Sequence, residues 1–284
     1  MKGPPLKREK KSPSHLSHAI INDVKERDSS TMTKPIQFDL HIGQKKPYSK
    51  NHDACPFCKP KKLTGILEKR GHMIWLMNKY PVFHGTWPTV LIETDKHKSE
   101  LTLYSPKHLH EVISFGLEKW EQVEQEHRFR SVIYFRNFGP RSGGSIRHPH
   151  SQIMGLDEYD YTDSIRSENF FGPIIYEDDD CFASLSDYPI CGMAEFNVTM
   201  KSDGHVESFA DTLQTIARFV LHDFPIPCDS YNLFFYKMKH IHVKIFPRYI
   251  ASPLYLGYKI TQVVDDRSKA FIMKRLHESD YFGG

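Results

Sequence analysis

The chain has 284 residues, of which 39% are hydrophobic and 26% are charged, and its formal net charge is +3. Residues 1–34 hold eight Lys or Arg against four Asp or Glu, which leaves the rest of the chain at −1. A net charge of −1 on residues 35–284 excludes the basic surface that binds nucleic acid. No apolar run is long enough to cross a bilayer. Neither nucleic acid nor a membrane is therefore an expected partner, and the predicted location is the cytoplasm.

The first residues of the chain are polar and largely aperiodic. We predict that residues 1–34 form a disordered N-terminal tail. An alternative interpretation is that residues 1–31 extend a chain whose natural start is Met32.

Residues 35–156 are predicted to form the first of two halves. Strands are expected at 73–77 and 89–94, and Ser105 followed by Pro106 is a typical start for the helix expected over 105–127. β-branched and aromatic residues predict a strand at 131–137, and a turn with several glycines leads from it to a strand that begins at His148.

After an acidic, aromatic connector at 157–173, residues 174–284 repeat this order. The expected elements are strands at 181–186 and 194–200, a helix at about 206–222, and strands at 231–238 and 240–248. Both halves close on an H-x-H strand, and each carries a Tyr-Pro dipeptide, although one shared dipeptide can also arise by chance. We predict an internal duplication and an α+β fold in which antiparallel sheets carry helices on one face.

The sequence His148-Pro149-His150-Ser151-Gln152 carries the strongest chemical signal. On a strand, residues two apart share a face, so His148, His150 and Gln152 would point to one spot. In the preceding turn, Gly143 and Gly144 let backbone N–H groups approach an anion closely. The pattern favours a histidine nucleophile beside a phosphate site, although one H-x-H pair alone is equally typical of a polar face or a metal site.

A pair of cysteines, Cys55-Pro56-Phe57-Cys58, is typical of half a zinc site. Five cysteines in a chain without an export signal do not indicate a disulfide framework. A redox CxxC pair is the rival interpretation, but no pattern places these cysteines at a helix N-terminus. The further ligands could come from His148 and from His108 or His110, which spacing alone does not separate.

The three motifs CPFC, SPKH and HPHSQ, in this order, resemble the galactose-1-phosphate uridylyltransferase family, the transferase branch of the histidine-triad superfamily. The resemblance spans residues 36 to about 250. It implies duplicated histidine-triad-like modules and sites that often draw on a second subunit, hence a possible homodimer. It also implies zinc on Cys55, Cys58, His108 and His148.

The resemblance further implies roles for single residues. His150 would be the covalent nucleophile, Gln152 would bind the phosphoryl group, and Ser145 and Asn137 would contact phosphate and nucleotide. Asn78 falls where the family has an asparagine near the ribose.

The chain departs from the family where the second substrate would bind. Lys259 follows Gly257-Tyr258 where well-known members carry a carboxylate that holds sugar hydroxyls, so galactose 1-phosphate is not favoured. The segment expected to carry phosphate-binding arginines has only Lys45 and Lys46, and Arg141 and Arg147 are alternative partners. In the second half, Lys244 shares a strand face with His240 and His242, which disfavours a second metal.

Three hypotheses follow for the function. The leading one is a ping-pong nucleotidyltransferase that moves a nucleoside monophosphate from a nucleotide sugar to a phosphate-bearing acceptor through His150. Gln152 supports transfer over hydrolysis, because an amide does not titrate. The second is a phosphorylase that acts on a nucleotide sugar or a dinucleoside polyphosphate, and the third is a non-catalytic, zinc-stabilised nucleotide-binding protein.

Overall fold

The computed structural model describes residues 35–47, 55–201, 205–250 and 252–283. The predicted tail at 1–34 therefore lies outside the described residues. The helices are α2 (Leu40–Gln44), α3 (Pro106–Gln125), α4 (Val206–His222), α5 (Pro253–Tyr258) and α6 (Asp266–Leu276). The strands are β1 (Ile66–Arg70), β2 (Met73–Met77), β3 (Thr86–Ile92), β4 (Ser131–Phe138), β5 (His150–Leu156), β6 (Ile174–Glu177), β7 (Cys181–Leu185), β8 (Phe196–Met200), β9 (Tyr231–Lys237) and β10 (Ile241–Pro247).

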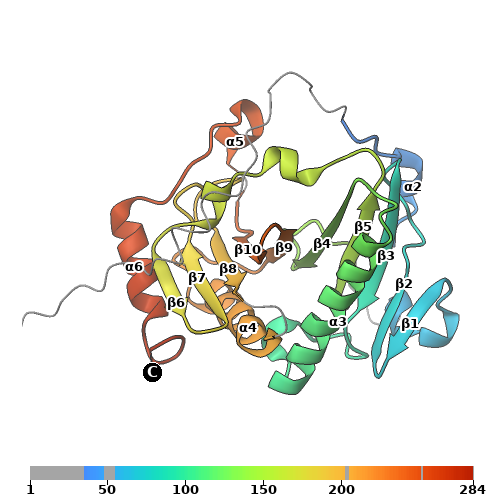
Figure 1. Cartoon of the computed structure of the whole chain (residues 1–284), viewed down its shortest axis with the longest axis horizontal. Helices are drawn as coiled ribbons and strands as arrows, with labels where there is room; N and C mark the ends of the chain where they lie inside the picture. Colours follow the sequence, from blue (N-terminus) through green and yellow to red (C-terminus); the bar gives the residue numbers. More distant parts are fainter. Residues whose placement is uncertain (1–34, 48–54, 202–204, 251, 284) are drawn as a thin grey trace, which may run out of the picture.

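The ten strands form one antiparallel sheet in the order β1-β2-β3-β5-β4-β9-β10-β8-β7-β6 (Figure 1). Strands β4 and β9, one from each half, pair at the centre of this sheet. The order outward from this seam is the same in both directions, so each half contributes five strands in an equivalent arrangement. The α+β class is confirmed, and the antiparallel strands of the two halves join into a single sheet.

Helices α3 and α4 lie side by side on one face of the sheet (Figure 1). Ser105 caps α3 through its hydroxyl, which accepts from the backbone N–H of His108, and Pro106 occupies the first turn, as the sequence predicts. Beneath the helices, the rings of Tyr134 and Phe235 stack 4.0 Å apart across the β4–β9 seam. Both rings belong to one continuous apolar core, so the two halves are packed together.

The predicted elements agree with the observed ones to within a few residues, but the sequence does not predict the short helix α2 or four further elements. Strands β1 and β6 are the two edges of the sheet, where a short, partly charged strand has only one neighbour and no clear period. Helices α5 and α6 follow the last strand and are short or strongly charged. Their sequences therefore lack the extended periodicity that reveals α3 and α4.

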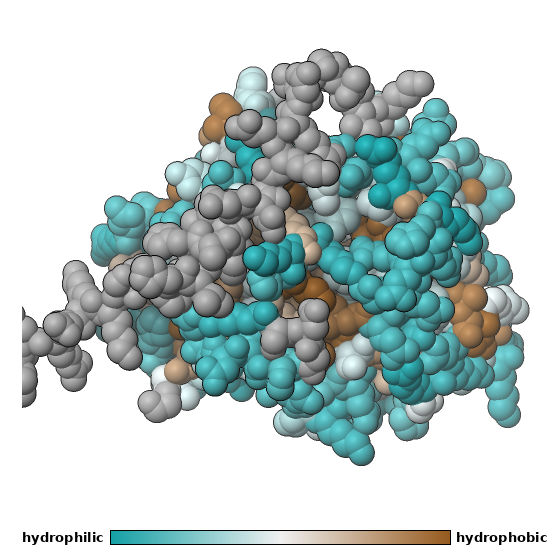
Figure 2. Space-filling view, viewed as in Figure 1, coloured by the Kyte–Doolittle hydropathy of each residue, from teal (hydrophilic) through white to brown (hydrophobic). Residues whose placement is uncertain are grey.

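The opposite face of the sheet is crossed by the predicted connector at 157–173, which contains two short 3-10 turns (Figure 1). Phe170 in the second turn is fully buried and packs on Tyr236 and His242. His150 and Gln152 lie on this face. The side of the molecule in Figure 2 is mostly hydrophilic, with apolar residues gathered near its centre. Within the described residues, no helix is both long and apolar enough to span a membrane.

Candidate active site and metal centre

Strand β5 lies between β3 and β4, and His150 at its first position pairs with Ile92 on β3. The His150 Nδ1 lies 2.8 Å from the His148 carbonyl oxygen. A carbonyl only accepts, so Nδ1 carries the proton and Nε2 of the neutral ring keeps its lone pair. The imidazole is 7% exposed, and burial lowers its pKa below the ordinary value. The side chain is therefore a neutral, oriented nucleophile candidate.

The turn before β5 is held open by its glycines and by a neighbouring strand. Gly139 and Gly143 have φ angles of +87° and +83°, which other residues rarely adopt. Asn232 on β9 donates to the Asn137 side chain at 2.6 Å and to the Ser142 carbonyl at 2.9 Å. The turn is thus fixed by the second half of the molecule. Gly143 is exposed and Ser145 is half-buried, so their backbone donors are open to a ligand, whereas the Gly144 N–H donates to the Ser142 hydroxyl at 3.4 Å.

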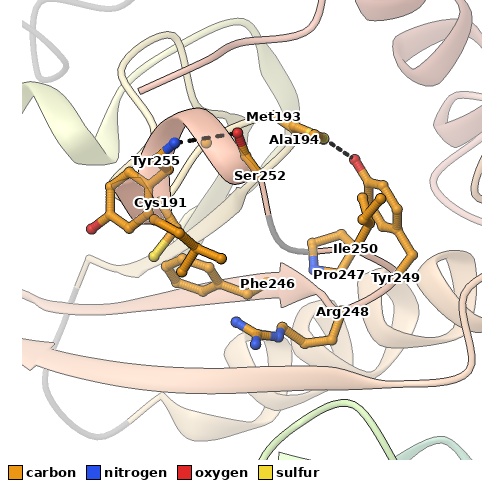
Figure 3. A pocket seen from close by; sticks show the side chains of 12 residues that line it. Cys191, Met193, Ala194, Phe246, Pro247, Arg248, Tyr249, Ile250, Ser252 and Tyr255 are labelled. Carbon is orange, nitrogen blue, oxygen red and sulfur yellow. Dashed lines mark hydrogen bonds between the residues drawn. The ribbon is translucent and has the colours of Figure 1, made fainter. Parts of the chain in front are cut away.

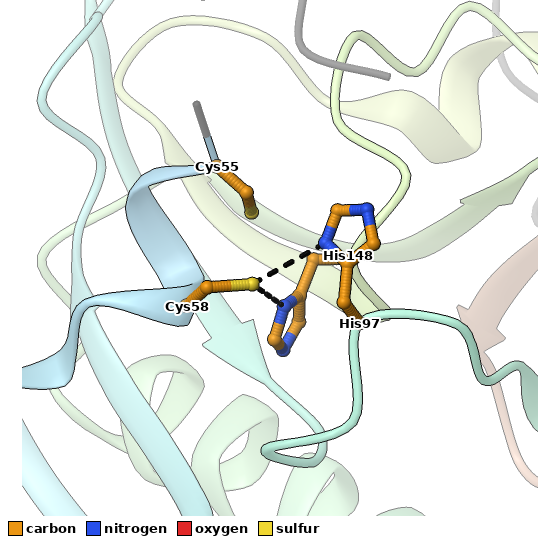
Figure 4. Close-up of side chains that lie close together, drawn as sticks. All are labelled: Cys55, Cys58, His97 and His148. Atoms are coloured by element: carbon orange, nitrogen blue, oxygen red, sulfur yellow. Dashed lines mark hydrogen bonds between the residues drawn. The ribbon is translucent and has the colours of Figure 1, made fainter. Parts of the chain in front are cut away.

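Four side chains with the ligand set of a structural zinc site meet beside the start of β5 (Figure 4). They are Cys55, Cys58, His97 and His148, and their ligand atoms lie within 4.8 Å of one another. The Nδ1 atoms of both histidines are 3.3 Å from the Cys58 sulfur. From the usual zinc bond lengths, the sulfur–nitrogen edge of a tetrahedron is about 3.5 Å, so the arrangement fits this metal.

The His148 ring is oriented in the way that metal-ligating histidines usually are. Its Nε2 donates to the Thr94 carbonyl at 2.7 Å, which leaves Nδ1 to face the two cysteines. This carbonyl follows β3, the strand that pairs with β5. The sheet itself therefore selects the tautomer that a metal requires.

The expected ligand His108 does not lie in this cluster, and His97 takes that place. His108 is in the first turn of α3, where its ring packs edge-on against Tyr104 with centroids 4.7 Å apart. His97 instead lies shortly after β3, at the end of the sheet where β5 begins, and it is 5% exposed. The sequence signal that could have indicated His97 is its position just after a predicted strand, although its burial is not visible from a local pattern.

A buried ion pair between Arg136 and Glu93 supports the segment around His148, and the sequence analysis does not predict it. Arg136 on β4 donates from Nε to Glu93 at 3.0 Å, and the two side chains are 3% and 1% exposed. The Arg136 Nη1 also donates to the Tyr231 hydroxyl at 2.9 Å, which in turn donates to Glu100. Because Glu93 also bonds the Pro149 carbonyl through its backbone, this network links β9 to the residues on either side of Pro149.

One predicted substrate-binding residue, Asn78, lies away from His150. The Asn78 backbone bonds Pro88, whose partner on β5 is Met154, four residues along the strand from His150. The Asn78 side chain accepts from the Tyr80 backbone. Arg141 is exposed in the turn and lies 3.4 Å from Asp229. Gln152 lies on β5, Asn137 is near the end of β4, and Gly143, Gly144 and Ser145 lie in the turn between these strands.

Aligning the two H-x-H motifs makes Lys244 the second-half equivalent of Gln152. The register agrees, because Gln152 pairs with Phe135, Lys244 pairs with Phe234, and these phenylalanines face each other across the seam. Lys244 is fully buried and donates to Glu195 at 2.8 Å and to Asn197 at 2.9 Å. An ammonium thus occupies the face on which the second half would hold a metal.

The fold that carries this site is shared with several solved structures. A galt-like protein from Arabidopsis thaliana is 16% identical, with 85% of this chain and 98% of that chain covered and a TM-score of 0.66. An ADP-glucose phosphorylase from Arabidopsis thaliana, solved with bound ADP-glucose, is also 16% identical, with 84% and 93% covered and a TM-score of 0.64. At this identity the likeness shows the fold, which is that of galt-like proteins.

The chain belongs to the DUF4931 family. The model for the N-terminal domain of this family, a domain of unknown function, matches residues 38–159, and the model for the C-terminal domain matches residues 162–282. A DUF4931 family protein from Bacillus cereus ATCC 10987 is 38% identical, with 74% of this chain and 96% of that chain covered and a TM-score of 0.67. No curated protein matches the chain in sequence. The resemblance to uridylyltransferases is thus confirmed for the fold, while the family is DUF4931.

Proposed function

We propose that this protein is a nucleotidyltransferase that moves a nucleoside monophosphate through a covalent intermediate on His150. The observation that carries the proposal is the bond from His150 Nδ1 to the His148 carbonyl, which leaves a lone pair on Nε2 at the start of β5, the strand that follows the glycine-bearing turn. A neutral imidazole held in this way can attack the α-phosphorus of a phosphoanhydride donor. The bridging oxygen leaves with the electron pair, and a phosphate-bearing acceptor then takes the nucleotidyl group.

The turn and Gln152 would stabilise the charge that develops on the phosphoryl oxygens. Donors available for this purpose are the Gly143 and Ser145 backbones, the Ser145 hydroxyl and the Gln152 amide. Asn137 lies at the base of the same turn, fixed by Asn232. Arg141 adds a positive charge at the rim. Since the Gln152 amide does not titrate and cannot protonate a leaving group, the arrangement suits transfer to a phosphate better than hydrolysis.

We further propose that the cluster of Cys55, Cys58, His97 and His148 holds zinc. A zinc ion there would have no open position for substrate, and its contribution would be structural. Through His148 it would fix the residue whose carbonyl orients His150. The proposed roles of the metal and the nucleophile are therefore coupled through His148 and His150, which are two residues apart in the chain.

Relatives of the same fold are consistent with this chemistry. One similar structure is described as a uridylyltransferase, at 18% identity with 85% of this chain and 98% of that chain covered and a TM-score of 0.62. The ADP-glucose phosphorylase described above cleaves the same kind of phosphoanhydride. Both similar structures support a nucleotide donor. They do not identify the group at the other end of its phosphates, which could be a sugar or another group.

The test is intact-protein mass spectrometry after brief mixing with UDP-glucose, ADP-glucose, GDP-mannose and dinucleoside tetraphosphates. The reaction should be stopped at alkaline pH, because phosphoramidates are labile in acid. We expect an added nucleoside monophosphate with the native protein and none with His150→Asn. Gln152→Ala, as the matched variant one step along the same face, should form the adduct more slowly. If His150→Asn folds normally and still forms the adduct, the nucleophile is another residue and the proposal is wrong.

A further inference from the structure

A cavity of about 120 Å³ lies where β10 ends, between residues 191–194, the segment Phe246–Ile250 and α5 (Figure 3). This volume is far more than the roughly 10–15 Å³ that one water molecule needs. Most of the described residues around it are apolar or aromatic: Met193, Ala194, Phe246, Tyr249, Tyr255 and Leu256. We call it the aromatic pocket.

The polar groups of the aromatic pocket are mostly engaged within the protein. The Tyr249 hydroxyl donates to the Met193 sulfur at 2.7 Å, and the Ser252 hydroxyl bonds Gln262. Among the described lining residues there is no carboxylate, amide or histidine side chain, and Arg248 carries the only charge. The hydroxyls of a hexose would lose water here without finding partners, which is costly. A planar aromatic ring, by contrast, would gain contact with several aromatic faces.

The aromatic pocket adjoins the turn that is proposed to bind phosphate. The Arg248 Nε donates to the Arg141 carbonyl at 3.4 Å, and the Arg248 backbone N–H donates to Ser230 at 2.8 Å. Ser230 in turn accepts from the Arg141 backbone through its hydroxyl at 3.0 Å. Arg248 thus lies between the turn and the cavity, where its guanidinium suits a phosphate group.

The distance from the nucleophile indicates how long the bound group must be. Ser151 on β5 pairs with Arg136 on β4, so His150 lies opposite Asn137. Asn137 in turn pairs with Asn232 on β9, and Asn232 pairs with Phe246 on β10. His150 and Phe246 are therefore three strands apart on one face, which at the usual strand spacing is about 14 Å. A hexose attached to the second phosphate of a nucleotide sugar would lie beside the turn, short of the cavity. A longer phosphate chain that ends in a second nucleoside would reach it.

We propose that the aromatic pocket binds the nucleobase of the leaving group, so that the donor is a dinucleoside polyphosphate. This inference rests on the proposed function. His150 Nε2 forms a bond to the α-phosphorus, the bond from that phosphorus to its bridging oxygen breaks, and a nucleoside polyphosphate leaves with the electron pair beside Arg141 and Arg248. An oxygen of inorganic phosphate then bonds to the same phosphorus, the nitrogen–phosphorus bond breaks, and a nucleoside diphosphate is released.

The test compares pairs of donors that share the transferred nucleotide and differ in the leaving group. Diadenosine, diguanosine and diuridine tetraphosphates are matched with ADP-glucose, GDP-glucose and UDP-glucose, and inorganic phosphate is the acceptor. For the preferred base, we expect kcat/KM to be at least tenfold higher with the dinucleoside donor. Tyr255→Ala should lower that value about tenfold to hundredfold, the usual effect of losing one base–aromatic stack. It should change the value for the nucleotide sugar less than twofold.

Tyr258→Ala is the matched control, because Tyr258 is on the same helix, is 76% exposed and does not line the cavity. Tyr258→Ala should leave kcat/KM unchanged for both the dinucleoside donor and the nucleotide sugar. A higher kcat/KM with the nucleotide sugar, or an equal effect of Tyr255→Ala on both donors, would overturn the inference while a His150 adduct still upholds the proposed function. If no donor forms an adduct, calorimetry with ATP, GTP and UTP decides. If Tyr255→Ala binds a nucleotide at least tenfold more weakly than the native protein, the result supports base binding in the aromatic pocket. Unchanged nucleotide binding rejects it.

Discussion

Replacing Lys244 with Met should destabilise the protein although the two side chains are similar in length. The Lys244 ammonium is fully buried and donates to Glu195 at 2.8 Å, to Asn197 at 2.9 Å and to Ser186 at 3.3 Å. Burial lowers the pKa of Lys244, and the negative charge of Glu195 opposes that shift. Each charge therefore offsets the cost of burying the other. Removing one partner of such a pair typically costs about 3–5 kcal/mol, because the other charge stays buried alone.

The structure places this variant at the lower end of that range. After the change, the Glu195 carboxylate still accepts from the backbones of Ile190, Cys191 and Gly192 at 2.8, 2.7 and 3.2 Å. We therefore expect Lys244→Met to lower the free energy of unfolding by about 3 kcal/mol, and Glu195→Gln, which strands the ammonium, by about 5 kcal/mol. The double variant should lose at least ~2 kcal/mol less than the sum of the two, since the charges are coupled.

Urea unfolding followed by circular dichroism measures these differences, provided that the slope with denaturant is unchanged. Lys201→Met is the control, since Lys201 pairs with Glu177 near the surface and such pairs contribute at most about 1 kcal/mol. Two results would refute the reasoning. One is a Lys244→Met protein as stable as the native one, and the other is a double variant whose loss equals the sum of the single losses.

Three further predictions concern the metal, the pH dependence and the buried network. Cys58→Ser and His97→Gln should reduce bound zinc from about one ion per chain to nearly none by elemental analysis, whereas His108→Gln should retain it; loss of zinc in His108→Gln alone would contradict the observed cluster. Burial lowers the pKa of His242 to about 3, so the unfolded state binds more protons below pH 6.5. Stability should therefore fall by about 2 kcal/mol from pH 7 to pH 5 through this residue. That dependence should vanish in His242→Phe and persist in the surface variant His72→Gln. Arg136→Met should cost about 3–5 kcal/mol in urea unfolding, because it leaves the buried Glu93 without a cationic partner, while Arg128→Met at the surface should cost less than about 1 kcal/mol.

Local rules predict much of this molecule. Helix α3 follows from Ser105 and Pro106, whose capping chemistry acts within one turn. The shared face of His150 and Gln152 follows from strand alternation. The choice between His97 and His108 does not follow, because it depends on which of the two, one in the segment after β3 and the other in α3, reaches His148 in the folded chain. The Glu93–Arg136 pair joins residues 43 positions apart, and nothing near either residue announces a buried partner.

The two halves share one chain topology but carry different residues on the face of the sheet opposite the helices. Around Gln152, the first half places an apolar group of Ile74, Leu76, Val90 and Ile92. The equivalent register positions around Lys244 include Ser184, Asn197 and Thr199, which are polar and fully buried. Thr199 bonds the His242 ring at 2.8 Å, and Phe170 from the connector covers that ring.

His242 is thus the equivalent of His150 but is enclosed by packing and by a side-chain hydrogen bond. A histidine can act as a nucleophile only if one nitrogen keeps an accessible lone pair, so the second half lacks the feature on which the proposed chemistry depends. What it offers instead is a rigid ionic centre whose carboxylate, Glu195, fixes the backbone of Cys191 and Gly192 at the rim of the aromatic pocket. Duplication would then have given one half that reacts and one half that shapes the binding site of the leaving group.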